Sequence, residues 1–136
     1  MRGLIQRVSR ASVHVGQENV GEISRGLVLL LGIEKADTSV EVDKLLNKTL
    51  SYRVFPDEKN HMNLSLLDIV GELLVVSQFT LAADTKKGLR PSFSSAAQPD
   101  IARALYDEFV TLAQSRCATS TGEFGADMQV ELVNDG

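Results

Sequence analysis

The sequence predicts a single α/β domain in which mixed or antiparallel β-sheets form a barrel-like layer covered by two helices. A chain of 136 residues fits one domain and can bury a sizeable core. Two near-continuous apolar runs, 27–33 and 73–76, are typical of strands that are buried on both faces. Two further segments carry helix start signals followed by apolar residues at three- and four-residue spacing. No repeat, low-complexity tract or linker divides residues 1–136.

The first third of the chain is expected to form a β-hairpin followed by a central strand. Apolar and polar residues alternate from Ala11 to Val15, which indicates a half-exposed strand. Residues 16–19 then turn the chain, and 20–23 form a short return strand. The run 27–33 is apolar throughout, so we expect it in the middle of the sheet, together with 73–76.

Two helices are expected to lie on the sheet. The segment 38–41 reads Thr-Ser-Val-Glu and matches the capping box that starts a helix. Pro99 and Asp100 are typical of the first turn of a second helix, which we expect to run to about Arg116. The apolar faces expected to be buried are Val42, Leu45, Leu46 and Leu50 in the first helix, and Ile101, Leu105, Phe109 and Leu112, with Ala102 and Ala113 beside them, in the second.

Short strands are expected between and after the helices. Residues 61–66 alternate and predict an edge strand with Met62, Leu64 and Leu66 facing inward and His61 facing solvent. The segment 119–122 is expected only to end the second helix. The closing strand is expected at 128–133, with Met128, Val130 and Leu132 facing the core.

The stretch 73–81 is the best candidate for a functional element. It predicts a buried strand that becomes polar at Ser77, Gln78 and Thr80, so hydroxyls, an amide and backbone N–H groups stand at the end of a rigid strand. A long loop follows at 82–95. It holds the most basic local cluster in the chain, Lys86, Lys87 and Arg90, which is either a solvated surface or an anion-facing one.

Composition excludes several classes of function. The net charge is −4 and the pI is near 5.1, which argues against DNA binding or other broad nucleic-acid binding. No apolar run approaches the length of a membrane span and no signal peptide is evident, so we expect a cytosolic protein without a membrane partner. The single cysteine, Cys117, and the histidines His14 and His61 show no metal-ligand spacing, so neither a metal nor a cofactor is expected.

The polar residues of 77–80 favour binding over covalent catalysis. A threonine or serine hydroxyl becomes a nucleophile when a base lies beside it, and no histidine occurs in this segment. Preorganised donors that stabilise an oxyanion are therefore the better interpretation. Arg7, on the first strand between apolar neighbours, is either a solvated residue or a clamp.

The sequence resembles the D-aminoacyl-tRNA deacylases over essentially its whole length. Four stretches carry the resemblance: 4–13 (LIQRVSRASV), 76–84 (VSQFTLAAD), 90–93 (RPSF) and 128–136 (MQVELVNDG). The resemblance implies a homodimer that hydrolyses the ester between a D-amino acid and the 3′ end of tRNA, and that also clears glycine from tRNA. A non-catalytic module that binds adenosine or an RNA 3′ end on the same fold is the alternative.

The resemblance also implies roles for particular residues. Ser77, Gln78, Phe79 and Thr80 would line the pocket for the terminal adenosine and the aminoacyl group, and Met128 would contact the substrate. Thr80 matches a threonine regarded either as the nucleophile or as part of the pocket wall. In the second view the 2′-hydroxyl of the tRNA assists hydrolysis, while backbone N–H groups near residues 77–79 polarise the ester carbonyl.

A second family signature is a Gly-cis-Pro pair that the partner subunit inserts into the pocket to reject L-amino acids. Gly136 matches its glycine, and Arg7 matches the arginine that braces the pair. The proline is expected beyond Gly136, in a tail that the sequence does not include. The basic residues Lys86, Lys87 and Arg90 are expected to touch the acceptor stem. The sequence does not rank amino acids or tRNAs.

Overall fold

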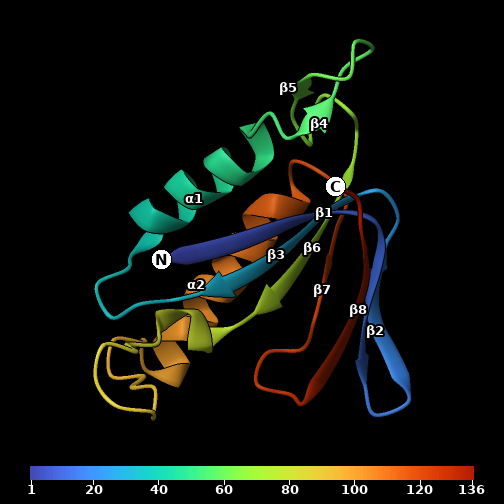
Figure 1. Ribbon diagram of the computed structural model, residues 1–136. Coiled ribbons are helices and arrows are strands. Elements are labelled where there is room, and N and C mark those ends of the chain that lie inside the picture. Colours follow the sequence, from blue (N-terminus) through green and yellow to red (C-terminus); the bar gives the residue numbers. More distant parts are fainter.

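The computed structural model describes residues 1–136 (Figure 1). Two α-helices, one short 3₁₀ helix and eight strands follow one another along the chain. In order, they are β1 (Arg2–Val15), β2 (Glu18–Ile23), β3 (Gly26–Gly32), α1 (Ser39–Ser51), β4 (Phe55–Pro56), β5 (Met62–Leu64), β6 (Glu72–Ser77), η1 (Phe79–Ala82), α2 (Pro99–Gln114), β7 (Thr119–Thr121) and β8 (Met128–Asn134). No helix is long and apolar enough to cross a membrane.

The main sheet is mixed, and its order is β2-β1-β3-β6-β7, with β8 also paired to β1. Strand β1 is long enough to pair antiparallel with β3 through its first half and with β2 and β8 through its second half. Strands β3 and β6 are parallel neighbours in the middle of the order. The expected central position of the two apolar runs is therefore confirmed.

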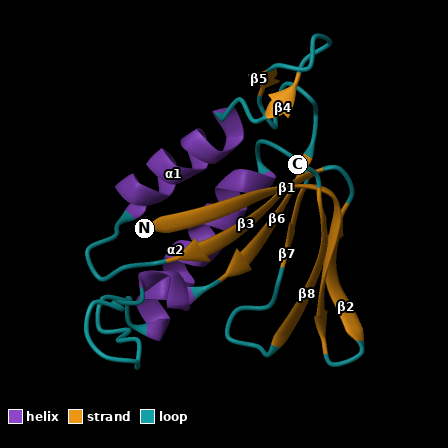
Figure 2. Cartoon of the chain, in the orientation of Figure 1, coloured by secondary structure: helices purple, strands orange, loops and turns teal.

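The two faces of β3 and β6 belong to two different cores. Leu29 and Val75 face α1 and α2, whereas Val28, Leu74 and Val76 face the interior of the barrel-like part. Successive side chains of a strand point to opposite faces, so a strand buried on both sides needs an unbroken apolar run. The two helices thus cover one face of the sheet, and β2, β7 and β8 curl away from them (Figure 2).

Strands β2 and β7 come together and nearly close the barrel. The hydroxyl of Ser120 donates a hydrogen bond to the carbonyl oxygen of Glu22 at 2.8 Å. A Cβ atom at Gly21 would overlap the carbonyl oxygen of Thr121, so this close approach of two backbones requires glycine. Strand β7 was not expected, because 119–122 contains only a few small polar residues and gives no apolar alternation.

The helices begin as the sequence predicts. Thr38 caps α1 and forms a complete capping box with Glu41, and Pro99 lies in the first turn of α2. One expected core residue of α2 is wrong: the side chain of Ile101 is 54% exposed, and Tyr106 is buried among the core residues instead. The buried stripe of α2 therefore consists of Ala102, Leu105, Tyr106, Phe109 and Ala113.

Two strand predictions need correction. The strand predicted over 73–81 ends at Ser77, because the chain turns into the 3₁₀ helix η1 from Phe79 onward. The edge strand predicted over 61–66 is confirmed only as the three residues of β5, which pair antiparallel with β4. Met62 was expected to face inward but is 66% exposed, because this two-stranded ribbon stands apart from the main sheet.

Candidate active site

Strand β6 ends in a polar turn, Ser77–Phe79, that neighbouring strands hold in place. Its residues Leu73 to Val76 are at most 1% exposed, and β6 is held by β3 on one side and β7 on the other. The backbone N–H of Gln78 still bonds to the carbonyl oxygen of Leu31 at 2.8 Å, so the pairing with β3 extends one residue past the strand. The side chains that follow are therefore mounted on fixed backbone.

A cavity of about 530 Å³ opens beside this turn. This volume lies within the range that small-molecule sites occupy, and ten of the fifteen lining residues are hydrophobic. Asp127 is the one lining residue with a formally charged side chain. The lining residues are Leu31, Ile33, Val76, Ser77, Gln78, Phe79, Ala97, Pro99, Ala102, Phe124, Gly125, Ala126, Asp127, Met128 and Val130.

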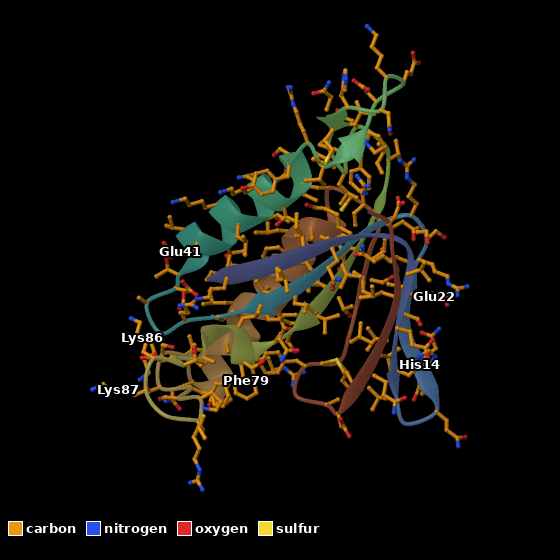
Figure 3. All side chains as sticks on the ribbon, viewed as in Figure 1. His14, Glu22, Glu41, Phe79, Lys86 and Lys87 are labelled. Carbon is orange, nitrogen blue, oxygen red and sulfur yellow. The ribbon has the colours of Figure 1, made fainter.

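Four of the site residues proposed from sequence thus line one cavity: Ser77, Gln78, Phe79 and Met128. Thr80 is next to the cavity and not part of its lining. Its hydroxyl oxygen accepts a hydrogen bond from the side-chain amide of Gln78. Phe79 lies at the start of η1 (Figure 3). It is 58% exposed, and its ring meets that of Phe93 edge-on, with 5.2 Å between the ring centroids.

No histidine lies beside Thr80. His14 is on β1, on the barrel side of the molecule away from Phe79 (Figure 3), and His61 precedes β5. No histidine, lysine or arginine is among the residues that line the cavity. The side-chain hydrogen bond of the Thr80 hydroxyl is with the amide of Gln78 and not with a histidine or a carboxylate, so no general base is hydrogen-bonded to the group that would have to lose a proton.

The backbone donors of the turn are not equivalent. The N–H of Gln78 is engaged with β3. The N–H of Ser77 points the other way, toward the side of β7, which has already ended at Thr121. Phe79 is the first residue of η1, so its N–H has no partner within that helix. The donors available to a ligand are thus those of Ser77 and Phe79.

The sequence interpretation proposed Met128 but missed the rest of this cavity wall, residues 124–127. Phe124 packs against Tyr106 of α2, with 5.5 Å between ring centroids, and Met128 lies against Gly122. Residues 124–127 follow a short strand that was itself not expected, so no periodic pattern pointed to them. The one available signal was an aromatic residue between two glycines, Gly122 and Gly125, in an otherwise polar segment.

The basic loop lies next to the turn and is exposed. Backbone bonds between Asp84 and Ser92 close it at its base, and the Phe79–Phe93 contact ties it to η1. Lys86 and Lys87 project from it into solvent (Figure 3). The loop therefore presents cations beside the cavity without contributing to its lining.

Arg7 and Gly136 contact each other but lie away from the cavity. The guanidinium of Arg7 donates to the carbonyl oxygens of Asp135 and Val54, each at 2.5 Å, and stands against Gly136. Arg7 pairs with Leu27 of β3, whereas the cavity lies at the level of Leu31, roughly 13 Å farther along the strand. One chain therefore does not bring the Arg7–Gly136 contact to the Ser77–Phe79 turn.

Comparison with known proteins assigns the family. The profile of the family described as D-Tyr-tRNA(Tyr) deacylase matches residues 4–136. A protein of Cellvibrio japonicus (strain Ueda107) named D-aminoacyl-tRNA deacylase is 64% identical over 137 residues, which span all of this chain and 94% of that protein. A protein of the same name from Pseudoalteromonas translucida (strain TAC 125) is 61% identical over the same shares of both chains.

Two solved structures have the same fold. One, described as c-Myc DNA unwinding element binding protein, has a TM-score of 0.95 and 41% identity over all of this chain and 93% of its own. The other, described as a probable eukaryotic D-amino acid tRNA deacylase, has a TM-score of 0.87 over 98% of this chain and 94% of its own. Its identity is 16%, so it shows the fold alone. By the profile match and the two bacterial relatives, the chain belongs to the D-Tyr-tRNA(Tyr) deacylase family.

Proposed function

We propose that this protein hydrolyses the ester bond between a D-amino acid and the 3′-terminal ribose of tRNA, releasing free D-amino acid and tRNA. Family membership over nearly the whole chain carries this proposal. The cavity beside Ser77, Gln78 and Phe79 supports it, because its largely apolar lining and its few polar groups suit a terminal nucleoside and an aminoacyl group.

The chemistry rests on placement and on backbone donors. The N–H groups of Ser77 and Phe79 are the available donors for the ester carbonyl, whose oxygen becomes negatively charged in the transition state. The hydroxyl of Thr80 already accepts a hydrogen bond from Gln78, which draws electron density from the oxygen that would have to attack. The 2′-hydroxyl of the terminal ribose stands next to the ester in any bound pose and assists the attack of water.

Selection against L-amino acids requires a second copy of the chain. In one chain the Arg7–Gly136 contact is separated from the cavity, so we propose a homodimer in which Arg7 and Gly136 of one subunit complete the site of the other. Coexpression tests this arrangement. Arg7→Ala and Gln78→Ala chains, each defective alone, should together restore about a quarter of the wild-type sites in a randomly mixed dimer. Restoration of no activity would contradict a shared site.

The proposed site should accept glycyl-tRNA as well as D-aminoacyl-tRNA. A site that rejects an L-amino acid by leaving no room for its side chain cannot reject a hydrogen atom, so we expect hydrolysis of glycyl-tRNA as well. The exposed Lys86, Lys87 and Arg90 are expected to contact the phosphates of the acceptor stem. The cytoplasm, where aminoacyl-tRNA is used, is the expected location.

The decisive experiment compares D-tyrosyl-tRNA with L-tyrosyl-tRNA as substrates. We expect rapid deacylation of the D-ester and none of the L-ester above the spontaneous rate. Equal rates on both esters would refute the proposal. If the protein binds a stable D-aminoacyl-adenosine analogue but turns over neither ester, it is the non-catalytic module that binds an RNA 3′ end.

A further inference from the structure

The outer side of the cavity wall carries one cation that belongs to neither the turn nor the basic loop. The guanidinium carbon of Arg103, on α2, lies 5.9 Å from the ring centroid of Phe124. Phe124 lines the cavity, and so does Ala102, the residue before Arg103. A guanidinium at this distance from an aromatic face is attracted to it, so the contact holds the Arg103 side chain at the cavity wall.

Arg103 forms only a long and exposed ion pair. Its Nε lies 3.8 Å from a carboxylate oxygen of Asp107, and the two side chains are 64% and 61% exposed. An exposed pair at this distance contributes little to stability, so the guanidinium can exchange this partner for another anion. Its N–H groups form a planar fork that matches the oxygen atoms of a phosphate.

Several carboxylates surround the cavity, so a cation at its wall would favour the binding of an anionic ligand. Asp127 lines the cavity, and Asp100, Asp107 and Glu123 lie on the two elements beside Arg103. A nucleic-acid end that approaches this acidic wall would be repelled unless a cation offsets the carboxylates. Lys86, Lys87 and Arg90 belong to the loop before α2 and not to the wall that contains Phe124.

We propose that Arg103 binds the 5′-phosphate of the 3′-terminal nucleotide while Phe124 packs against its nucleoside. This inference rests on the proposed function and deepens it by assigning a contact to the sugar–phosphate backbone at the cavity. Arg103 is then a substrate-binding residue that recognises no base and no amino acid. It fixes the depth at which the terminal nucleotide enters the cavity, and so the distance between its ester and the Ser77–Phe79 turn.

The experiment compares two small substrates that differ by one phosphate: 3′-O-D-tyrosyl-adenosine and its 5′-monophosphate. Wild-type protein should prefer the phosphorylated substrate by roughly ten-fold in kcat/KM, as expected for a hydrogen-bonded charge pair. Arg103→Gln should abolish the preference, so that its kcat/KM values for the two substrates become equal. Arg103→Lys should keep part of the preference for the phosphorylated substrate. Arg116→Gln removes the same charge just beyond the C-terminal end of α2 and should keep the whole preference.

The outcomes separate this inference from the proposed function. If wild-type protein hydrolyses both substrates at equal rates, or if Arg103→Gln slows both equally, the phosphate contact is refuted while the deacylase activity stands. If it hydrolyses neither these substrates nor D-tyrosyl-tRNA, the proposed function itself fails. Inhibition of tRNA deacylation gives a second measurement. Adenosine 5′-monophosphate should inhibit wild-type protein more strongly than adenosine does, and both should inhibit Arg103→Gln alike.

Discussion

The hydroxyl of Tyr106 donates a hydrogen bond of 2.9 Å to the carbonyl oxygen of Val75, and this bond joins α2 to β6 two residues before Ser77. The same carbonyl accepts the N–H of Gly122 at 3.0 Å, and the Tyr106 ring packs against Phe124. Burial, with a smaller effect of Asp107, raises the pKa of Tyr106 to about 12, so the phenol remains a donor at every physiological pH. One buried residue therefore connects the two walls of the cavity.

Replacing Tyr106 with phenylalanine should loosen both walls. The Val75 carbonyl keeps its bond to Gly122, so we expect a decrease of about 1–2 kcal/mol in the free energy of unfolding. Because Phe124 is then less firmly supported, KM should rise more than kcat falls. Denaturant unfolding and steady-state deacylation measure the two effects. Tyr52→Phe removes the hydroxyl of an exposed tyrosine and should change neither, so a similar decrease there would contradict a specific role for Tyr106.

The sequence predicts the central strands and the helices better than the residues that line the cavity. The central strands are long apolar runs and α1 begins at a complete capping box, so local signals agree with the tertiary structure there. Strand β7 has three residues, and it exists because β6 and β2 offer it partners, not because of its own pattern. No periodic pattern in the sequence therefore predicts the segment after β7 that forms the cavity wall and contains Phe124.

Other differences arise where a tertiary contact overrides a local pattern. Ile101 has the expected spacing to Leu105, but it lies about 100° around the helix from Ala102 and so outside the face that is buried. The apolar residues after Ser77 continue the pattern of β6, yet Leu81 belongs to a 3₁₀ turn that packs against Gly32. In the homodimer that we propose, Arg7 and Gly136 reach the cavity of a second chain, and no periodicity in one sequence can describe such a relation.

Gly32 supports the turn that presents Ser77, Gln78 and Phe79. A Cβ atom there would lie 3.0 Å from the backbone oxygen of Gln78 and 2.9 Å from the Cβ of Leu81, so Gly32→Ala must push the turn outward. A small displacement of reacting groups can lower the reaction rate by as much as roughly a hundred-fold. We therefore expect kcat of Gly32→Ala to fall by at least about ten-fold.

Gly3 provides the matched control for Gly32. A Cβ atom at Gly3 would also come within 2.9 Å of a neighbour, but that neighbour is the terminal methyl group of Leu29, which can rotate away. Gly3→Ala should therefore keep nearly full activity. Single-turnover deacylation, with circular dichroism to verify folding, compares the two variants. Equal kcat values would show that the position of the turn is not critical.

The capping box of α1 should make stability depend on pH. Hydrogen bonds from the Thr38 side chain, then its backbone N–H, hold the pKa of Glu41 below its ordinary value of 4.5. A lowered folded-state pKa gives stability that is present above pH 4.5 and is lost as the pH falls through the folded value. Glu41→Gln should lower Tm at pH 7 and flatten its decline below pH 4.5, measured by thermal unfolding. Glu58→Gln, in an exposed turn, should leave both unchanged.

The basic loop should act on tRNA through charge alone. Replacing Lys86 and Lys87 with glutamine should raise KM for D-tyrosyl-tRNA several-fold at low salt. It should also reduce the slope of log KM against log salt by about two, because each lysine neutralises one phosphate. The value of kcat should not change, because neither lysine lines the cavity. A Lys44→Gln, Lys59→Gln variant removes the same charge elsewhere, and an equal change in slope there would refute a local interaction.

Thr80 should prove dispensable for the chemical step. Its hydroxyl accepts a hydrogen bond from Gln78 and no base lies beside it, so Thr80→Ala should keep most of the wild-type kcat. Replacing the 2′-hydroxyl of the terminal ribose with hydrogen should abolish turnover by the unchanged protein, because the group that assists the attack is then missing. Thr85→Ala, in the exposed loop, controls for removal of a hydroxyl. A Thr80→Ala protein without activity, together with normal turnover of the 2′-deoxy substrate, would identify Thr80 as the nucleophile.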